Sequence, residues 1–270
     1  MKTSRRILKL RRKIKQMFAH FAMPGGFKLS RLYDSGELVI VAVGFRCFTK
    51  ARIKEHLGVE LEKSYPFDNG FFPPISVARV LKAKRINLNS DQPRPNHTVC
   101  VKHENYNDPT FGYGIKFDTS TYEEVNSAAA GRDMDDINQY LDRSFGYYTL
   151  DMENQFILAH YNWHFFAREN NPERIHDPIA NIKNINDMLN RRLDRLFQKC
   201  KAAKYIIFVF AETQGYKHMM IDNHHFDLSD LSPIEKVAKE IFPDAIVFVK
   251  NLDDINSPKK VLSLLDKTRK

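Results

Sequence analysis

The segment that decides the fold is Glu37-Leu-Val-Ile-Val-Ala-Val-Gly-Phe-Arg-Cys47. Its first half, Leu38 to Val43, is a short run of mostly β-branched residues between two glycines, which predicts a buried strand. Thr49 begins a helical pattern soon afterwards. Cys47 is therefore expected in a strand-to-helix turn, where free backbone N–H groups and the positive end of a helix lower the pKa of a thiol. Open α/β sheets place their ligand sites at such turns.

Strands and helices also alternate in the second half of the chain. Residues 205–210 and 245–249 are apolar and predict two more buried strands, and Asp177-Pro178 opens a long amphipathic helix that continues to about Cys200. Continuous apolar strands separated by helices indicate a parallel sheet covered on both faces. We therefore expect an α/β protein with a single domain, whose mainly parallel sheet is flanked by helices.

The domain is preceded by an arm of different composition. Residues 1–26 are expected to form a basic amphipathic arm, which ends at the break Met23-Pro-Gly-Gly26. Residues 27–270 are expected to form an α/β domain of catalytic type. Within it, the residues around 87–150 lack a regular pattern and predict an irregular insertion.

The net charge of +9 is concentrated in the arm. The first twenty residues contain eight Lys and Arg and no acidic residue, so the rest of the chain carries only +1. Apolar residues recur along one helical face from Ile7 to Phe21, which predicts that residues 1–22 lie on an anionic membrane surface. Packing of this helix on the body is the alternative. No nucleic acid is expected as a partner, because the body lacks interleaved basic and aromatic residues.

The sequence also predicts a compartment. Positive charges interrupt every apolar stretch that could serve as a signal peptide, and no run of about 20 apolar residues could span a membrane. Three scattered cysteines predict no disulfide framework and no zinc site, and Cys200 is assigned to the core. His224-His225 is interpreted as a polar loop rather than a metal site. We expect a cytoplasmic protein whose arm could attach it peripherally to the inner membrane face.

A cysteine nucleophile requires a base that accepts its proton. Among ten histidines, His160 is the preferred candidate, because it ends a short apolar segment and could reach the same sheet edge as Cys47. His164 is the alternative. For any one of these histidines, a structural role is the competing interpretation, and for Cys47 it is burial as a small apolar residue.

The remaining candidates are polar residues near these positions. Asp68, in Tyr65-Pro-Phe-Asp68, is the expected third catalytic member or a substrate contact, and a turn-forming carboxylate is the alternative. Asn162 and Glu212 compete for the same role.

Three arginines could bind an anionic acyl donor or a sugar phosphate. They are Arg46, Arg191 and Arg192, and a solvated helix face is the alternative for the pair. No NAD, P-loop or zincin motif occurs, so no bound cofactor or metal is expected. Acyl-coenzyme A is the candidate donor substrate.

Five short motifs follow one another along the chain: Gly44-Phe-Arg-Cys47, Ser64-Tyr-Pro-Phe-Asp68, Phe156-Ile-Leu-Ala-His160, Arg191-Arg192-Leu-Asp-Arg195 and Tyr205-Ile-Ile-Phe-Val-Phe210. In this order they resemble a bacterial family described as papain-like cysteine peptidases, a domain of unknown function. The resemblance covers about residues 38–250. Members of that family often accompany surface-polysaccharide genes.

The resemblance implies a thiol–imidazole pair of Cys47 and His160. It describes a catalytic arrangement rather than a fold, because alternating strands and helices do not match the helical and barrel lobes of papain. We expect an acyl-transfer enzyme that acts on a surface-polysaccharide precursor, with a glycan or acyl donor as substrate. A cysteine peptidase and a non-enzymatic, membrane-associated assembly protein are the alternatives.

Overall fold

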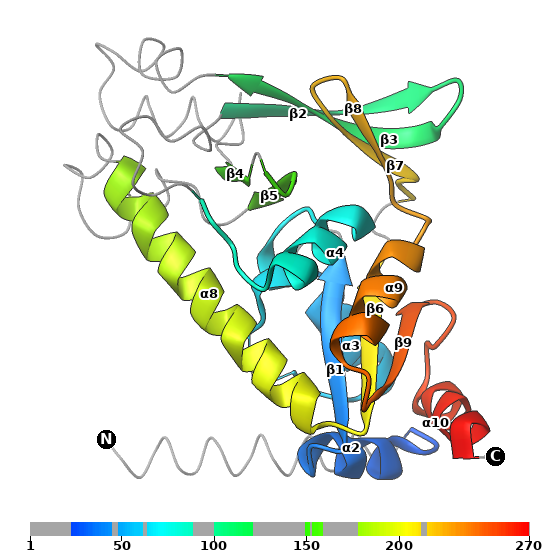
Figure 1. Ribbon diagram of the computed structural model, residues 1–270. Helices are drawn as coiled ribbons and strands as arrows, with labels where there is room; N and C mark the ends of the chain where they lie inside the picture. Colours follow the sequence, from blue (N-terminus) through cyan, green and yellow to red (C-terminus); the bar gives the residue numbers. More distant parts are fainter. Residues whose placement is uncertain are drawn as a thin grey trace, which may run out of the picture.

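The computed structural model describes residues 23–44, 48–61, 64–88, 100–120, 149–151, 153–158, 178–211 and 215–269. Within these ranges the protein is mixed α/β, with six α-helices, a three-stranded parallel sheet, a four-stranded mixed sheet and a two-stranded sheet (Figure 1). The predicted helix of residues 1–22 lies outside the described residues.

The parallel sheet has the strand order β1 (Leu38–Gly44), β6 (Tyr205–Ala211), β9 (Ile246–Asn251). Every residue of β1 and of β6 is buried. A strand covered on both faces must be apolar along its whole length, which is why the sequence marked these strands clearly. The prediction of one parallel sheet containing residues 38–43, 205–210 and 245–249 is confirmed for these strands.

Helices cover both faces of the parallel sheet. Alternate residues of β1 divide between two hydrophobic clusters, with Val41 in one and Ile40 in the other. The cluster of Ile40 contains residues of α2 (Gly26–Asp34), α3 (Phe48–Leu57) and α10 (Pro258–Asp266). The cluster of Val41 contains residues of α4 (Pro74–Ala83), α8 (Pro178–Ala202) and α9 (Ser232–Ile241).

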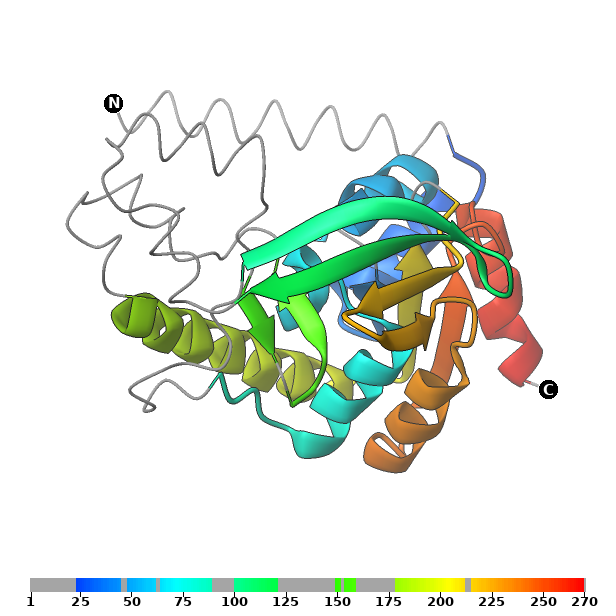
Figure 2. The same cartoon turned by 90° about the horizontal axis from the view of Figure 1, so that it is seen from above.

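The mixed sheet lies beyond the carboxyl ends of the parallel strands (Figure 1) and crosses above them when seen from the top (Figure 2). Its strand order is β2 (Cys100–Asp108), β3 (Gly112–Ser120), β7 (His218–Ile221), β8 (His224–Asp227). Inward side chains such as Phe117 join the hydrophobic cluster of Val41. The pairing of these four strands in one sheet was not predicted, and β2 and β3 lie in the segment expected to be an irregular insertion.

The interpretation of His224-His225 as a loop is wrong. Both residues are exposed side chains of β8, which pairs antiparallel with β7 through a turn at Asp222 and Asn223. Because β8 is an edge strand with only Phe226 and not its histidines buried, it lacks the apolar run by which the central strands were recognised.

A short hairpin forms the two-stranded sheet. It consists of β4 (Thr149–Asp151) and β5 (Phe156–Leu158). Ile157 of β5 accepts a hydrogen bond from the N–H of Phe71 at 2.6 Å and donates one to its carbonyl at 3.1 Å. This bridge fixes β5 beside the loop that follows η1 (Pro66–Asn69).

The carboxyl end of β1 requires glycine. Gly44 has φ +113°, and a Cβ atom there would lie 2.6 Å from Cδ2 of Phe210, whose ring is buried in the core. The ring of Phe210 therefore packs where a side chain of residue 44 would lie. Only a glycine combines this backbone conformation with so close an approach of the neighbouring strand.

Replacement of Gly44 tests this packing, and Gly36 provides a matched control. Gly36 also has a positive φ, +81°, but nothing lies within 4 Å of its missing Cβ. Gly36→Ala should cost about 1–2 kcal/mol of stability through backbone strain alone. Gly44→Ala should cost about 1–3 kcal/mol more, because the added methyl overpacks the core. Urea unfolding measures both losses, and equal losses would contradict the account.

Candidate functional site

Two parallel strands end together at one edge of the sheet. Gly44, the last residue of β1, is paired with Ala211, the last residue of β6. Residues 45–47 and 212–214 continue from these two positions and lie outside the described residues. The predicted site residues Arg46, Cys47 and Glu212 therefore remain predictions, although the positions at which the chain leaves the sheet towards them are adjacent.

Asp68 is the candidate residue that the structure describes in most detail. It belongs to η1, a single 3-10 turn that packs against β1 and α8, and it is only 4% exposed. Its Oδ2 accepts a hydrogen bond from the backbone N–H of Tyr65 at 2.9 Å and from Nζ of Lys50 at 3.2 Å. Its Oδ1 is buried and has no hydrogen-bond partner within the described part of the chain. One half of this carboxyl group is therefore satisfied and the other half is not.

Burial dominates the electrostatics of Asp68. It raises the pKa of this carboxyl group above its usual value, and the opposing effects of Lys50, the Tyr65 N–H group and Arg192 do not cancel it. The ionised form is thus held in an environment that solvates it poorly. A further hydrogen-bond donor at Oδ1 would stabilise that form.

A second buried aspartate shows what a fully satisfied carboxylate looks like in this protein. Asp151 of β4 is 0% exposed, and its Oδ1 accepts the N–H groups of Glu153 at 2.9 Å and Asn154 at 2.8 Å. Its Oδ2 accepts Nδ2 of Asn154 at 2.9 Å. Both carboxylate oxygens of Asp151 accept hydrogen bonds within a turn, whereas Oδ1 of Asp68 accepts none from the described residues. This difference marks Asp68 rather than Asp151 as the functional candidate.

A second unsatisfied polar atom lies in the first turn of α3. Thr49 is 3% exposed, and its buried Oγ1 has no hydrogen-bond partner among the described residues. Thr49 directly precedes Lys50, the partner of Asp68. Unsatisfied buried polar atoms are rare in folded proteins. Of the three among the described residues, one belongs to Asp68 and one to the chain neighbour of its partner Lys50, while the third is Nε2 of His56, further along α3.

Positive charge surrounds Asp68 from two helices. Besides Lys50 of α3, the α8 residue Arg192 is close enough to lower the pKa of Asp68. Arg195, one turn further along α8, donates a hydrogen bond from Nη1 to the carbonyl oxygen of Ser64 at 3.3 Å. The predicted Arg191 is exposed instead.

Sequence reasoning named Arg192 as a candidate site residue, included Arg195 only as part of a motif, and did not name Lys50. The signal of Lys50 and Arg195 was only positional, because Lys50 follows Cys47 by one helical turn and Arg195 follows Arg192 by one helical turn.

The described range 153–158 ends two positions before the predicted base His160. β5 ends at Leu158, and His160, Asn162 and the alternative base His164 lie outside the described residues. The bridge between Ile157 and Phe71 nevertheless places the end of this strand near η1, which carries Asp68.

The third cysteine has the structural role predicted for it. Cys200 is 0% exposed at the end of α8, and burial raises the pKa of its thiol to about 12. A buried thiol with so high a pKa is unreactive at neutral pH.

Among the described residues, no group of three or more His, Cys, Asp and Glu side chains is placed to hold a metal ion. The helices in the same ranges are all too short or too polar to cross a membrane. In comparisons with known proteins, no family model, curated protein or solved structure matches the chain. The family resemblance of the motifs therefore stays a prediction.

Substitution of the two buried aspartates tests the distinction between them. Asp68→Asn should leave stability at pH 7 unchanged or raise it by about 1 kcal/mol, because an amide carries no charge to desolvate and still accepts the Tyr65 N–H. Asp151→Asn should cost about 1–3 kcal/mol, because the new NH₂ group faces an N–H donor.

The pH dependence of stability in the same variants shows whether the ionised Asp68 stabilises or destabilises the fold. A carboxyl group whose folded pKa is raised is most favourable at low pH and loses stability as the pH rises through that pKa. Any advantage of Asp68→Asn over the wild type should thus be present at pH 7 and vanish near pH 4. Urea unfolding at both pH values measures it. A large loss of stability at pH 7 in Asp68→Asn would show that Asp68 is a structural residue like Asp151.

Proposed function

We propose that the protein is a cysteine-nucleophile acyl-transfer enzyme that acts on a surface-polysaccharide precursor. In this proposal Cys47 is the nucleophile, His160 is the general base and Asp68 orients the base. The single observation that carries it is the buried, unpartnered Oδ1 of Asp68. A neutral imidazole offers one N–H donor, and a carboxylate oxygen that holds this donor leaves the other ring nitrogen free to accept a thiol proton.

Chain connectivity supports a meeting of these three residues. Cys47 is joined by one peptide bond to Phe48, the first residue of α3, and Lys50 in the same turn contacts Asp68. His160 lies two residues beyond Leu158, so it is within about 7 Å of the end of β5. That strand is bonded to Phe71, three residues after Asp68. These contacts of the described anchors support a catalytic group of Cys47, His160 and Asp68.

The proposed reaction has two steps. The thiolate of Cys47 attacks the carbonyl carbon of a thioester donor, and the donor leaves as a thiol that takes a proton from the His160 imidazolium. A hydroxyl group of the glycan then attacks the Cys47 thioester, gives its proton to His160 and carries the acyl group away. Each step breaks one acyl bond and forms another.

The surroundings of Asp68 fit a donor that carries phosphate groups. Lys50 and Arg192 add positive charge around it, and Arg195 adds another guanidinium group at the carbonyl of Ser64, four residues before Asp68. Guanidinium groups bind phosphates in bidentate geometry. Arg46 and Arg191 are proposed to extend this charge, and Asn162 and Glu212 to contact the acceptor. Phe48 is 52% exposed beside Cys47 in the chain, which offers an apolar surface to the acyl group. Acyl-coenzyme A combines these features.

Attachment to the membrane completes the proposal. Residues 1–22 of the basic arm are proposed as an amphipathic helix that holds the enzyme on an anionic membrane surface on the cytoplasmic side. Surface-polysaccharide precursors would be met there.

Intact-mass spectrometry after incubation with acyl-coenzyme A donors of several chain lengths tests this function. We expect one acyl adduct on Cys47, which hydroxylamine removes because it is a thioester. Cys47→Ser should abolish the adduct. Cys200→Ser should leave it unchanged, since Cys200 is fully buried and its thiol pKa is raised to about 12.

The same experiment separates the alternatives. Absence of an adduct with every donor, together with turnover of peptide substrates that depends on Cys47, would favour a cysteine peptidase. Absence of both activities would favour the non-enzymatic assembly protein.

A further inference from the structure

The basic residues of this protein are concentrated in two segments from opposite ends of the sequence. Residues 1–34 contain ten Lys and Arg and a single acidic residue, and residues 257–270 contain five and one. Residues 35–256 contain 27 basic and 31 acidic residues, a net charge of −4. The excess of positive charge thus belongs to the two ends and not to the middle of the chain.

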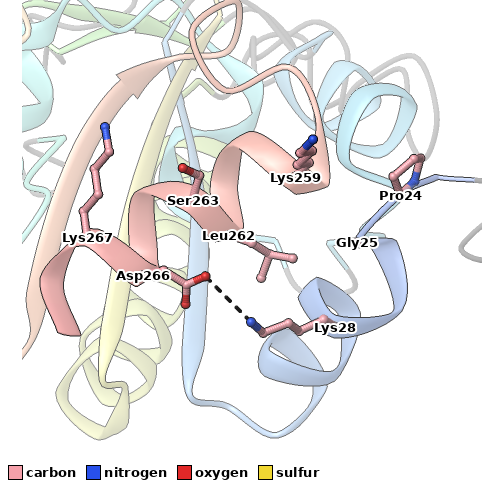
Figure 3. A pocket seen from close by; sticks show the side chains of 8 residues that line it. All are labelled: Pro24, Gly25, Lys28, Lys259, Leu262, Ser263, Asp266 and Lys267. Atoms are coloured by element: carbon pink, nitrogen blue, oxygen red, sulfur yellow. Dashed lines mark ion pairs between the residues drawn. The ribbon is translucent and has the colours of Figure 1, made fainter. Parts of the chain in front are cut away.

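The fold brings described parts of these two segments together. α2 and α10 pack together on one side of the parallel sheet (Figure 1). Leu29 of α2 and Val261 of α10 belong to one hydrophobic cluster. Gly25 permits the contact, because a Cβ atom there would lie 2.9 Å from Cδ1 of Leu262. Lys28 of α2 pairs with Asp266 of α10 at 3.8 Å (Figure 3). The described parts of the two basic segments, α2 and α10, therefore form one surface.

This surface combines positive charge with apolar groups. An open groove of about 650 Å³ lies between α2 and α10, with Pro24 and Leu262 in its lining and the exposed Lys28, Lys259 and Lys267 around it (Figure 3). A second groove of about 390 Å³ adjoins it and shares Pro24 and Lys259. Phe27, beside Lys28 on α2, is 60% exposed.

One acidic side chain does not neutralise this surface. Asp266 lines the groove with three lysines and is paired with one of them, Lys28, at side-chain exposures of 52% and 55%. So exposed an ion pair leaves both groups largely solvated. Lys259 and Lys267 therefore leave the groove with a net positive charge. The adjoining groove is lined by Met23, the first residue that the structure describes.

An anionic bilayer fits this combination better than a nucleic acid does. Lipid phosphates and carboxylates complement the lysines, while the interface accepts an exposed phenylalanine and an apolar groove. A single-stranded nucleic acid would require several aromatic side chains for base stacking along the basic surface. Among the described residues of α2 and α10, Phe27 is the one exposed large hydrophobic side chain.

We propose that the face formed by α2 and α10 docks directly onto an anionic phospholipid membrane. In this proposal the protein has two membrane contacts, residues 1–22 and the face of α2 and α10. The second contact brings the α/β domain itself against the bilayer. The proposal concerns attachment alone and is independent of the chemistry of Cys47. Two adjacent contacts bind more tightly than either one, because the second binds at a high effective concentration.

Vesicle sedimentation of the full-length protein tests this proposal. The probes are phosphatidylcholine vesicles with and without phosphatidylserine. Each lysine near an anionic leaflet strengthens binding about fivefold, so Lys259→Glu combined with Lys267→Glu should weaken binding to phosphatidylserine vesicles by at least about tenfold. Phe27→Ser should lower the binding that persists at high salt, where charge is screened.

A matched double variant controls for the change in net charge. Lys199→Glu combined with Lys236→Glu alters exposed lysines of α8 and α9, which cover the opposite face of the parallel sheet. This variant should bind vesicles as the wild type does, and both variants should keep the urea midpoint of the wild type. Equal binding by the two double variants would overturn the proposal and leave the arm as the membrane contact. Tighter binding to a single-stranded oligonucleotide than to vesicles, lost on Lys259→Glu with Lys267→Glu, would overturn it in favour of nucleic acid.

Discussion

Burial of β1 and β6 on both faces is the constraint on which the remaining structure depends. Every residue of these strands is covered, so a layer of helices must pack on each side. At the end of β1 the ring of Phe210 occupies the space of a side chain, and Gly44 must turn the chain away. α3 begins a few residues later, and its first turn places Lys50 against Asp68. The mixed sheet then covers the same hydrophobic cluster from the carboxyl ends of the strands.

Two of the three buried polar side-chain atoms that lack a partner among the described residues belong to Asp68 and to Thr49, the chain neighbour of Lys50, and the third is Nε2 of His56. Oδ1 of Asp68 and Oγ1 of Thr49 are both buried without a partner in the described part of the chain, and burial raises the pKa of Asp68. Such groups lower stability, and they persist in natural proteins chiefly where function requires them. The fully bonded Asp151 shows that the same fold can satisfy a buried carboxylate completely. We therefore attribute the cost at Asp68 to its role in the proposed site.

The sequence revealed those elements whose signal is local. The strands of the parallel sheet are apolar throughout, and α8 was recognised from its apolar period and its opening proline. α2 was missed because it begins at a pair of glycines and has no side-chain cap. In the candidate site, Asp68 was predicted from its motif, whereas Lys50 was not. Lys50 contacts Asp68, which is 18 positions away in the chain. The spacing of residues within one helix does not predict such a contact.

The most direct test of the central claim is the pH dependence of Cys47 alkylation in a Cys100→Ser background, in which the buried Cys200 does not react. If Asp68 orients His160 beside Cys47, the thiol should titrate well below its free pKa of about 8.5. Both His160→Ala and Asp68→Asn should then raise that pKa towards the free value. A thiol that titrates near 8.5 in the wild type, and is unaffected by either substitution, would contradict the account.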